Sequence, residues 1–223
     1  MKKVLLLFAI ILFVVCANAQ IKKGAVLIGG QISASSNKSE SQNNPPNLFL
    51  NSSVNNASVI GFNIGTAFKQ NKIAGINFTT SSTTSTNTNS INDVSTNTNN
   101  TNGIGLFYRS YKKLAKNFYF FGQADAAFLF GKGNTSNSSV TNSTFKSKGI
   151  STSFTIGAGY EIIKHVQIEI TIPNIIGFQS SKSTQTITGF NSNTITNTAT
   201  NIYSSFSNTG GLGALGVGFR VIL

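Results

Sequence analysis

Apolar and polar residues alternate along most of this chain with a period of two, which is the pattern of a β-strand with one apolar face. Within residues 150–161, Ile150 and Phe154 fall on one face, while Ser151 and Ser153 fall on the other. Segments with this pattern predict eight strands, near residues 24–35, 57–69, 72–82, 102–112, 117–132, 149–162, 165–178 and 210–223.

The connections between these strands are alternately short and long. The short ones are Gln70-Asn71, Lys113 to Lys116 and Ile163-Lys164. The long ones are rich in Ser, Thr and Asn and cover residues 36–56, 83–101, 133–148 and 179–209. Short turns at one end and long polar loops at the other are typical of a transmembrane β-barrel. The sequence therefore predicts an all-β fold: a transmembrane antiparallel up-and-down β-barrel with eight strands, four long extracellular loops and three short periplasmic turns.

A ten-strand alternative would add a hairpin within residues 184–198. Only Ile187, Phe190 and Ile195 are apolar in that segment. A membrane-spanning strand has about 9–11 residues, and every second one faces lipid, so three apolar residues in the whole hairpin are too few to face lipid. The eight-strand barrel is therefore favoured.

The first residues have the pattern of a secretory signal peptide. Two lysines precede an unbroken apolar stretch of twelve residues, 4–15, and Ala17-Asn18-Ala19 supplies the small side chains of a cleavage site. The apolar stretch is too short to span a membrane as a helix. The predicted domains are therefore a cleaved signal peptide, residues 1–19, and an outer-membrane β-barrel, residues 20–223.

The cysteine at position 16 raises the alternative of a lipoprotein. Lipid attachment favours a small residue just before the cysteine, and Val15 does not fit that pattern. Cleavage after Ala19 would remove the chain's single cysteine, so the mature protein would have neither a disulfide framework nor a thiol nucleophile.

The scarcity of charge decides which face of the strands is enclosed. Only 10% of the residues are charged, whereas ordinary soluble domains have about 25%. The lysines are predicted in turns, in loops and at strand ends, while a soluble sandwich would carry them along its solvent face. The apolar faces are therefore expected to point outward, as a lipid-facing band of Phe62, Ile64, Phe78, Leu106, Phe120, Phe128, Phe154, Ile168, Ile170 and Val217. An aromatic girdle near the short turns is predicted from Phe68, Phe118, Tyr160 and Phe219.

The remaining charges fall on the inward, polar faces. They include both arginines of the chain and three of its five acids: Arg109, Asp125, Glu161, Glu169 and Arg220. Paired Arg and carboxylate groups suit an enclosed, poorly hydrated space, so the five residues are predicted to form a charge network in the lumen. The network would fill the barrel structurally, because eight strands leave an interior just wide enough for side chains. A gated proton or ion path is the alternative.

The sequence offers little for catalysis or nucleic-acid binding. Its single histidine, His165, lies in a short turn without a Ser–acid partnership, and Glu40 and Asp93 are isolated in loops. We therefore predict no catalytic, cofactor-binding or metal site, and no enzyme activity. The net charge is +12, but the lysines are scattered and no basic helix or zinc motif occurs, so nucleic acid is not an expected partner.

The last predicted strand resembles a sequence signal that is found in a known group of proteins. Gly218, Phe219, Val221 and Leu223 have the spacing of the C-terminal assembly signal in small eight-stranded outer-membrane barrels, although Leu223 stands where an aromatic residue is usual. With the cleavage site and the alternating connections, the chain resembles the group of the OmpA transmembrane domain and OmpX. The cleavage site before Gln20 and the Ser/Thr/Asn bias resemble proteins of Bacteroidetes type.

The resemblance implies an integral protein of the Gram-negative outer membrane. The partners that it implies are outer-membrane lipid and lipopolysaccharide, and the barrel-assembly machinery during biogenesis. Two functions remain open at this point. One is a structural and surface-interaction scaffold that displays polar loops for adhesion or envelope integrity, which rigid barrels with variable loops favour. The other is a narrow channel or small-solute transporter through the lumen.

Overall fold

The computed structural model describes residues 21–42, 50–88, 93–137, 142–188, 193–204 and 215–223. The predicted signal peptide, residues 1–19, lies outside them. The strands are β1 (Val26–Gln42), β2 (Leu50–Lys69), β3 (Lys72–Thr88), β4 (Val94–Ala115), β5 (Phe118–Asn137), β6 (Asn142–Ile163), β7 (Val166–Thr188), β8 (Asn193–Tyr203) and β9 (Gly216–Ile222). No helix in this part of the chain is long and apolar enough to cross a membrane.

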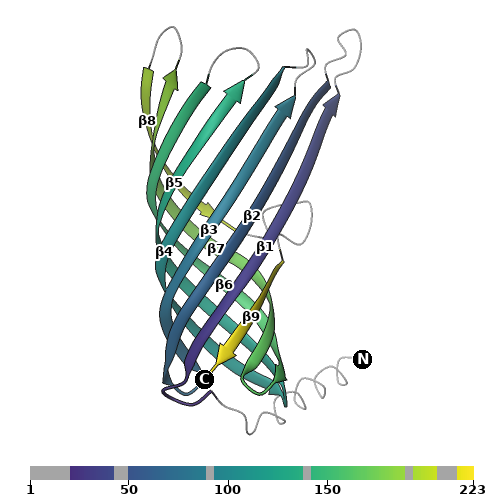
Figure 1. The fold of residues 1–223 in the computed structure, drawn as a ribbon, viewed down its shortest axis with the longest axis vertical. Helices are drawn as coiled ribbons and strands as arrows, with labels where there is room; N and C mark the ends of the chain where they lie inside the picture. Colours follow the sequence, from purple (N-terminus) through teal and green to yellow (C-terminus); the bar gives the residue numbers. More distant parts are fainter. Residues whose placement is uncertain (1–20, 43–49, 89–92, 138–141, 189–192, 205–214) are drawn as a thin grey trace, which may run out of the picture.

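Eight of these strands close into an antiparallel up-and-down barrel, as the sequence predicted (Figure 1). Each of β1 to β7 pairs with the next strand along the chain, and β9 joins β7 to β1. The closing strand pairs with β1 from Leu27↔Ile222 to Ser33↔Gly216. It pairs with β7 from Val166↔Val221 to Thr171↔Gly216. The prediction that the C-terminal strand closes the wall against the first strand is confirmed.

A ninth strand, β8, lies outside the eight that close the barrel and was not predicted. Beyond the segment that pairs with β9, β7 continues to Thr188 and pairs with β8 from Gly177↔Tyr203 to Ile187↔Asn193. The predicted loop 179–209 therefore contains a long hairpin. This hairpin is mainly polar and lies beyond the strands that close the lower barrel (Figure 1). Only at its base do the exposed Phe178 and Ile202, which are cross-strand partners, continue the apolar wall.

The other three predicted loops are also largely strand, which corrects the predicted boundaries. For example, β4 has 22 residues and includes the polar tract Ser95 to Asn102. That tract pairs with β3 through Thr83↔Asn99 and Ser85↔Asn97. The physical reason is that antiparallel backbones pair whatever their side chains, and the branched side chain of Thr favours the extended conformation.

The short turns lie at the end of the barrel that we call the turn end. Gln70-Asn71 forms the first turn as predicted. The second turn falls at residues 116–117, within and just after the predicted 113–116, and the third at residues 164–165, one residue later than predicted. Asn71 has φ 59° and His165 has φ 74°. Asn and His are the residue types that enter this left-handed region most readily after Gly.

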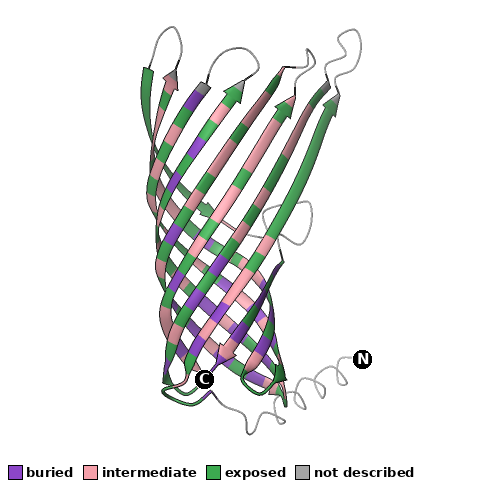
Figure 2. Ribbon diagram, viewed as in Figure 1, coloured by how far each residue is buried: buried purple, intermediate pink, exposed green. Residues whose placement is uncertain are grey.

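The barrel wall alternates between buried and exposed residues near the turn end (Figure 2). All ten residues of the predicted lipid-facing band are exposed, and Leu106 and Phe128 reach 67% and 70% exposure. The four residues of the predicted girdle are exposed as well. A closed antiparallel barrel with an apolar outer face and a polar interior is the architecture of a transmembrane β-barrel.

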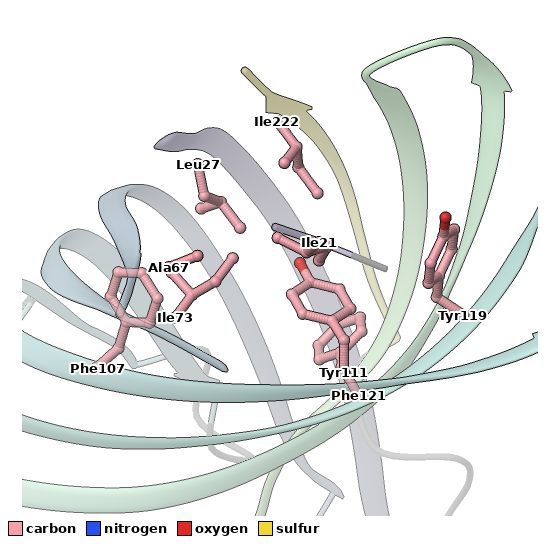
Figure 3. Packing of buried hydrophobic residues seen from close by; sticks show 9 residues of the cluster. All are labelled: Ile21, Leu27, Ala67, Ile73, Phe107, Tyr111, Tyr119, Phe121 and Ile222. Carbon is pink, nitrogen blue, oxygen red and sulfur yellow. The ribbon is translucent and has the colours of Figure 1, made fainter. Parts of the chain in front are cut away.

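An apolar cluster lies in the lumen at the turn end (Figure 3). We call it the lumen plug, and it consists of Ile21, Leu27, Ala67, Ile73, Phe107, Tyr111, Tyr119, Phe121 and Ile222. Ile21 reaches it from the segment before β1. Its backbone N–H donates to Asn71 Oδ1 at 2.9 Å, and the Asn71 N–H donates back to its carbonyl at 3.1 Å. The segment before β1 is thereby fixed across the end of the barrel.

Candidate functional site

Three fully buried charges meet in the lumen next to the plug. Arg109 on β4, Glu169 on β7 and Arg220 on β9 are each 0% exposed. Each occupies an inward position between two outward neighbours, so the strand alternation alone directs the three side chains to a common interior. The buried neighbours of Arg220 along β9 include Gly218, while Phe219 between them is exposed.

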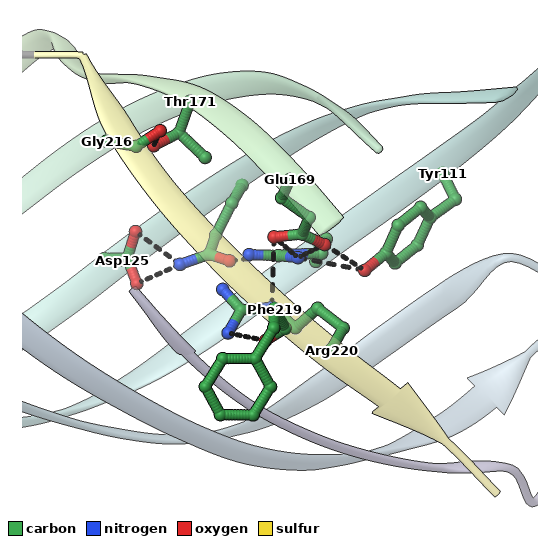
Figure 4. A network of polar contacts seen from close by, with 9 residues as sticks. Tyr111, Asp125, Glu169, Thr171, Gly216, Phe219 and Arg220 are labelled. Atoms are coloured by element: carbon green, nitrogen blue, oxygen red, sulfur yellow. Dashed lines mark hydrogen bonds and ion pairs between the residues drawn. The ribbon is translucent and has the colours of Figure 1, made fainter. Parts of the chain in front are cut away.

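The carboxylate of Glu169 bridges the two arginines (Figure 4). Arg109 Nη1 donates to Glu169 Oε1 at 2.8 Å and to Oε2 at 3.0 Å. Arg220 Nε lies 3.1 Å from Glu169 Oε2, as an ion pair without the geometry of a hydrogen bond. The hydroxyl of Tyr111 donates to Glu169 Oε1 at 3.2 Å. One carboxylate therefore compensates two guanidinium groups at once.

This triad spans the width of the lumen. In the closed ring of β1 to β7 and β9, four steps separate β4 from β9 in either direction. The two arginines therefore extend from opposite walls and meet at the carboxylate on β7. Because eight strands leave little interior space, a bridge across the lumen obstructs it.

Asp125 joins the triad through glutamine. Arg109 Nε donates to Gln123 Oε1 at 2.6 Å. Gln123 Nε2 then donates to Asp125 Oδ1 at 2.8 Å and to Oδ2 at 3.1 Å. Asn77 Nδ2 donates to the same Oδ1 at 2.7 Å. The linked group holds two cations and two carboxylates, so its formal charges balance.

Aromatic rings connect the charges to the lumen plug. The guanidinium carbon of Arg109 lies 4.1 Å from the centroid of the Phe121 ring and 5.6 Å from that of Tyr111. Arg109 Nη1 also donates to the Tyr111 hydroxyl at 2.9 Å. Stacking on an aromatic face favours a guanidinium that has lost its water. The plug and the network therefore form one continuous filling.

Glu161, the fifth predicted charge, lies apart from the other four. It is half-buried near the turn end, where Tyr119 donates its hydroxyl to Oε2 at 3.1 Å. The His165 backbone N–H donates to Oε1 at 3.3 Å. The pairing Glu161↔Gln167 places this residue one inward row nearer the turn than Glu169, which is opposite Gly159. The structure thus brings together four of the five residues.

Three participants were not among the predicted site residues, namely Asn77, Tyr111 and Gln123. All three lie on strands that were predicted and point inward. They could have been found in the sequence as polar side chains on the inward faces of those strands. Gly29 also contributes, because a Cβ atom there would overlap the Arg220 side chain. This glycine on β1 leaves the space in which the arginine lies.

The residues of the predicted assembly signal alternate between the two faces of β9. Gly218 is buried and inward, Phe219 and Leu223 are exposed and outward, and Val221 is half-buried. Recognition of this strand by an assembly machinery remains a prediction. In the described residues, no group of three or more His, Cys, Asp or Glu side chains is placed to hold a metal ion.

No protein-family model matches the chain, and no curated protein matches it. Among solved structures, it is similar to the outer membrane protein OprG from Pseudomonas aeruginosa, with a TM-score of 0.48 and 12% identity over 91% of this chain and 97% of that one. It is also similar to the outer membrane protease OmpT from Escherichia coli, with a TM-score of 0.45 and 9% identity over 92% of this chain and 96% of that one. A major outer membrane protein from Thermus thermophilus matches with a TM-score of 0.46 and 10% identity over 89% of this chain and 99% of that one.

Proposed function

We propose that this protein is an integral β-barrel of a Gram-negative outer membrane and that it acts as a closed structural and surface-interaction scaffold. The observation that carries the proposal is the Arg109–Glu169–Arg220 bridge across the lumen. Directly beside it, the lumen plug packs against Arg109 at the turn end of the barrel, next to an open hollow of about 540 Å³. A barrel filled in this way suits mechanical stability and display better than conduction.

Membrane insertion is supported by the outer wall. Large apolar side chains such as Leu106, Phe128 and Val217 are exposed around the barrel. Contiguous apolar surface of this extent is unfavourable in water, whereas hydrocarbon accommodates it. Where β9 lies, from Leu27 to Ser33 on β1 and from Val166 to Thr171 on β7, the hydrogen-bonded wall leaves no open sheet edge, as lipid requires.

Surface display is supported by the length of the strands. A tilted strand of about 9–11 residues spans the hydrocarbon layer, whereas β5 and β6 have 20 and 22 residues. The surplus lies at the end away from the short turns, where the residues are mainly Ser, Thr and Asn. These polar extensions would raise the hairpin ends above the membrane as a hydrated sheet. With the short turns in the periplasm, the extensions face the outside of the cell.

The scaffold and channel functions differ in conductance. We expect purified protein in planar lipid bilayers to show no stable open-pore current, because the bridge and the plug occupy the lumen. A second portion of the same preparation is run on a gel with and without boiling, and a shift in mobility on boiling shows that the protein was folded. Steady ohmic conductance from folded protein would overturn the scaffold and favour a channel or small-solute transporter.

Surface interaction is tested with a shortened hairpin. Ser181 on β7 is opposite Ala199 on β8, so joining these two positions by a short turn would remove the outer part of the hairpin and keep the rest in register. Cells with this variant should adhere less to a test surface than cells with equal amounts of the full barrel. Equal adhesion would count against display by this hairpin.

A further inference from the structure

Four lysines gather on the outer face of three adjacent strands, just beyond the apolar band. They are exposed and belong to β5, β6 and β7: Lys132, Lys146, Lys148 and Lys182. The sequence prediction placed lysines in turns, loops and strand ends, but these four lie within strands. We call them the lysine cluster.

The register brings like charges directly opposite each other. Lys132 on β5 is the cross-strand partner of Lys146 on β6. Lys148, two residues further along β6, is the partner of Lys182 on β7. Directly opposed residues have Cβ atoms about 4.5–5.5 Å apart, and like charges at that spacing destabilise a sheet. No salt bridge joins any of the four to a carboxylate in the described part of the chain.

The change from apolar to basic side chains is abrupt. Phe130 is opposite Lys148, and the preceding outward pair is Phe128 with Ile150. All three of these apolar residues are exposed. An open hollow of about 750 Å³ lies among Phe130, Asn100, Asn102 and the four lysines. One site thus offers a basic upper part and an apolar lower part.

The opposite side of the barrel lacks this arrangement. Along the outer face of β1 to β3, the described residues beyond the band are uncharged apart from Lys38 and Glu40, as in the row Ala34, Ser58 and Ser82. The one lysine described on that face, Lys38, forms an ion pair with Glu40. The lysine cluster is therefore a local feature of one side, and a general solubility requirement does not explain it.

We propose that the lysine cluster binds the phosphate groups of an anionic lipid of the outer leaflet, with the acyl chains lying along Phe130, Phe128 and Ile150. This inference rests on the proposed membrane insertion. Phosphate oxygens between the opposed ammonium groups would convert the repulsion into attraction. The neighbouring band supplies the hydrocarbon contact that a free phosphate or a soluble polyanion would not use.

The test compares the double variant Lys132→Thr/Lys148→Thr with the matched variant Lys69→Thr/Lys116→Thr. Threonine keeps the strand propensity, and the matched variant removes the same charge at the turn end. Each folded protein in zwitterionic detergent is titrated with bisphosphorylated lipid A, with phosphatidylcholine, and with lipid A plus excess inorganic phosphate. Because each lysine near anionic lipid contributes about 1 kcal/mol, the cluster variant should bind lipid A about thirtyfold more weakly than wild type.

Wild type and the matched variant should bind lipid A equally, and phosphatidylcholine should bind weakly to all three proteins. Equal lipid A binding by the cluster variant and wild type would overturn the proposal. So would complete displacement of lipid A by inorganic phosphate, which would indicate a free-anion site. Heat-modifiable mobility and membrane fractionation are measured separately, so failure of barrel insertion is distinguishable from failure of lipid binding.

Discussion

Replacing Glu169 with glutamine should strongly destabilise the barrel, because this carboxylate compensates two buried guanidinium groups. The substitution preserves volume but removes the charge that faces Arg109 at 2.8 Å and Arg220 at 3.1 Å. One glutamine rotamer also turns an N–H donor toward Arg220, and the other toward Tyr111 and Arg109. Removal of one partner of a buried ion pair typically costs about 3–5 kcal/mol, and two cations lose their partner here.

Glu161→Gln is the matched control. Glu161 is half-buried and accepts hydrogen bonds from Tyr119 and from the His165 backbone. A glutamine can keep one of these contacts, so we expect a loss of no more than about 1 kcal/mol. Urea unfolding of the refolded proteins in lipid vesicles, followed by heat-modifiable gel mobility and circular dichroism, measures both free energies of unfolding.

A third variant separates charge imbalance from the loss of interior contacts. In Arg109→Met/Asp125→Asn/Glu169→Leu/Arg220→Met the four charges of the linked group disappear together, and such replacements are often neutral or stabilising. We therefore expect the quadruple variant to be more stable than Glu169→Gln. If Glu169→Gln unfolds within about 1 kcal/mol of wild type, the triad does not carry the buried-charge energy that its geometry implies.

Two further substitutions probe the wall and the space under Arg220. Leu106→Lys places a charge in the middle of the apolar band and should cost about 2–4 kcal/mol in vesicle unfolding, whereas Asn102→Lys, outward on the same strand beyond the band, should cost much less. Gly29→Ala would bring a Cβ into the Arg220 side chain and should cost about 1–3 kcal/mol. A Cβ atom at Gly30 would make ordinary contacts, with a Phe219 ring carbon at 3.4 Å and the Gly61 carbonyl oxygen at 3.5 Å; an equal loss in the Gly30→Ala control would contradict the steric argument.

The closed part of the barrel could be predicted from sequence because its two environments differ. Lipid on one side and a packed lumen on the other require alternating side chains, and even the seven-residue strand β9 shows this in full. Its register follows, since a one-residue slip would move Arg220 to the lipid face. This alternation alone was enough to predict that each of the charged side chains points into the lumen.

The heights of those charges could not be predicted from alternation. A strand pattern gives the face of each residue, but the position along the barrel axis depends on the stagger between all eight strands. Local hairpin pairing places Glu161 one inward row from Glu169. Only the closed barrel shows that Glu169 is level with Arg109 and Arg220 from the other walls, while Glu161 remains near the turn end.

The strand β8 could not be predicted for a different reason. Ten of its eleven residues are exposed, without alternation. Where water contacts both faces of a sheet, no energy distinguishes the faces, so the sequence need not alternate. The period of two is therefore a marker of asymmetric surroundings, and its absence does not indicate a loop.

The end of the alternation then locates the membrane boundary within continuous strands. On β5, the outward residues Phe128 and Phe130 are followed by Lys132, although the strand continues to Asn137. On β6, the same change occurs between Ile150 and Lys148. Because the backbone pairing is unbroken across this change, the hydrocarbon edge and not the strand end determines where apolar side chains stop. The lysine cluster lies at that edge, where the phosphate groups of a lipid leaflet would be.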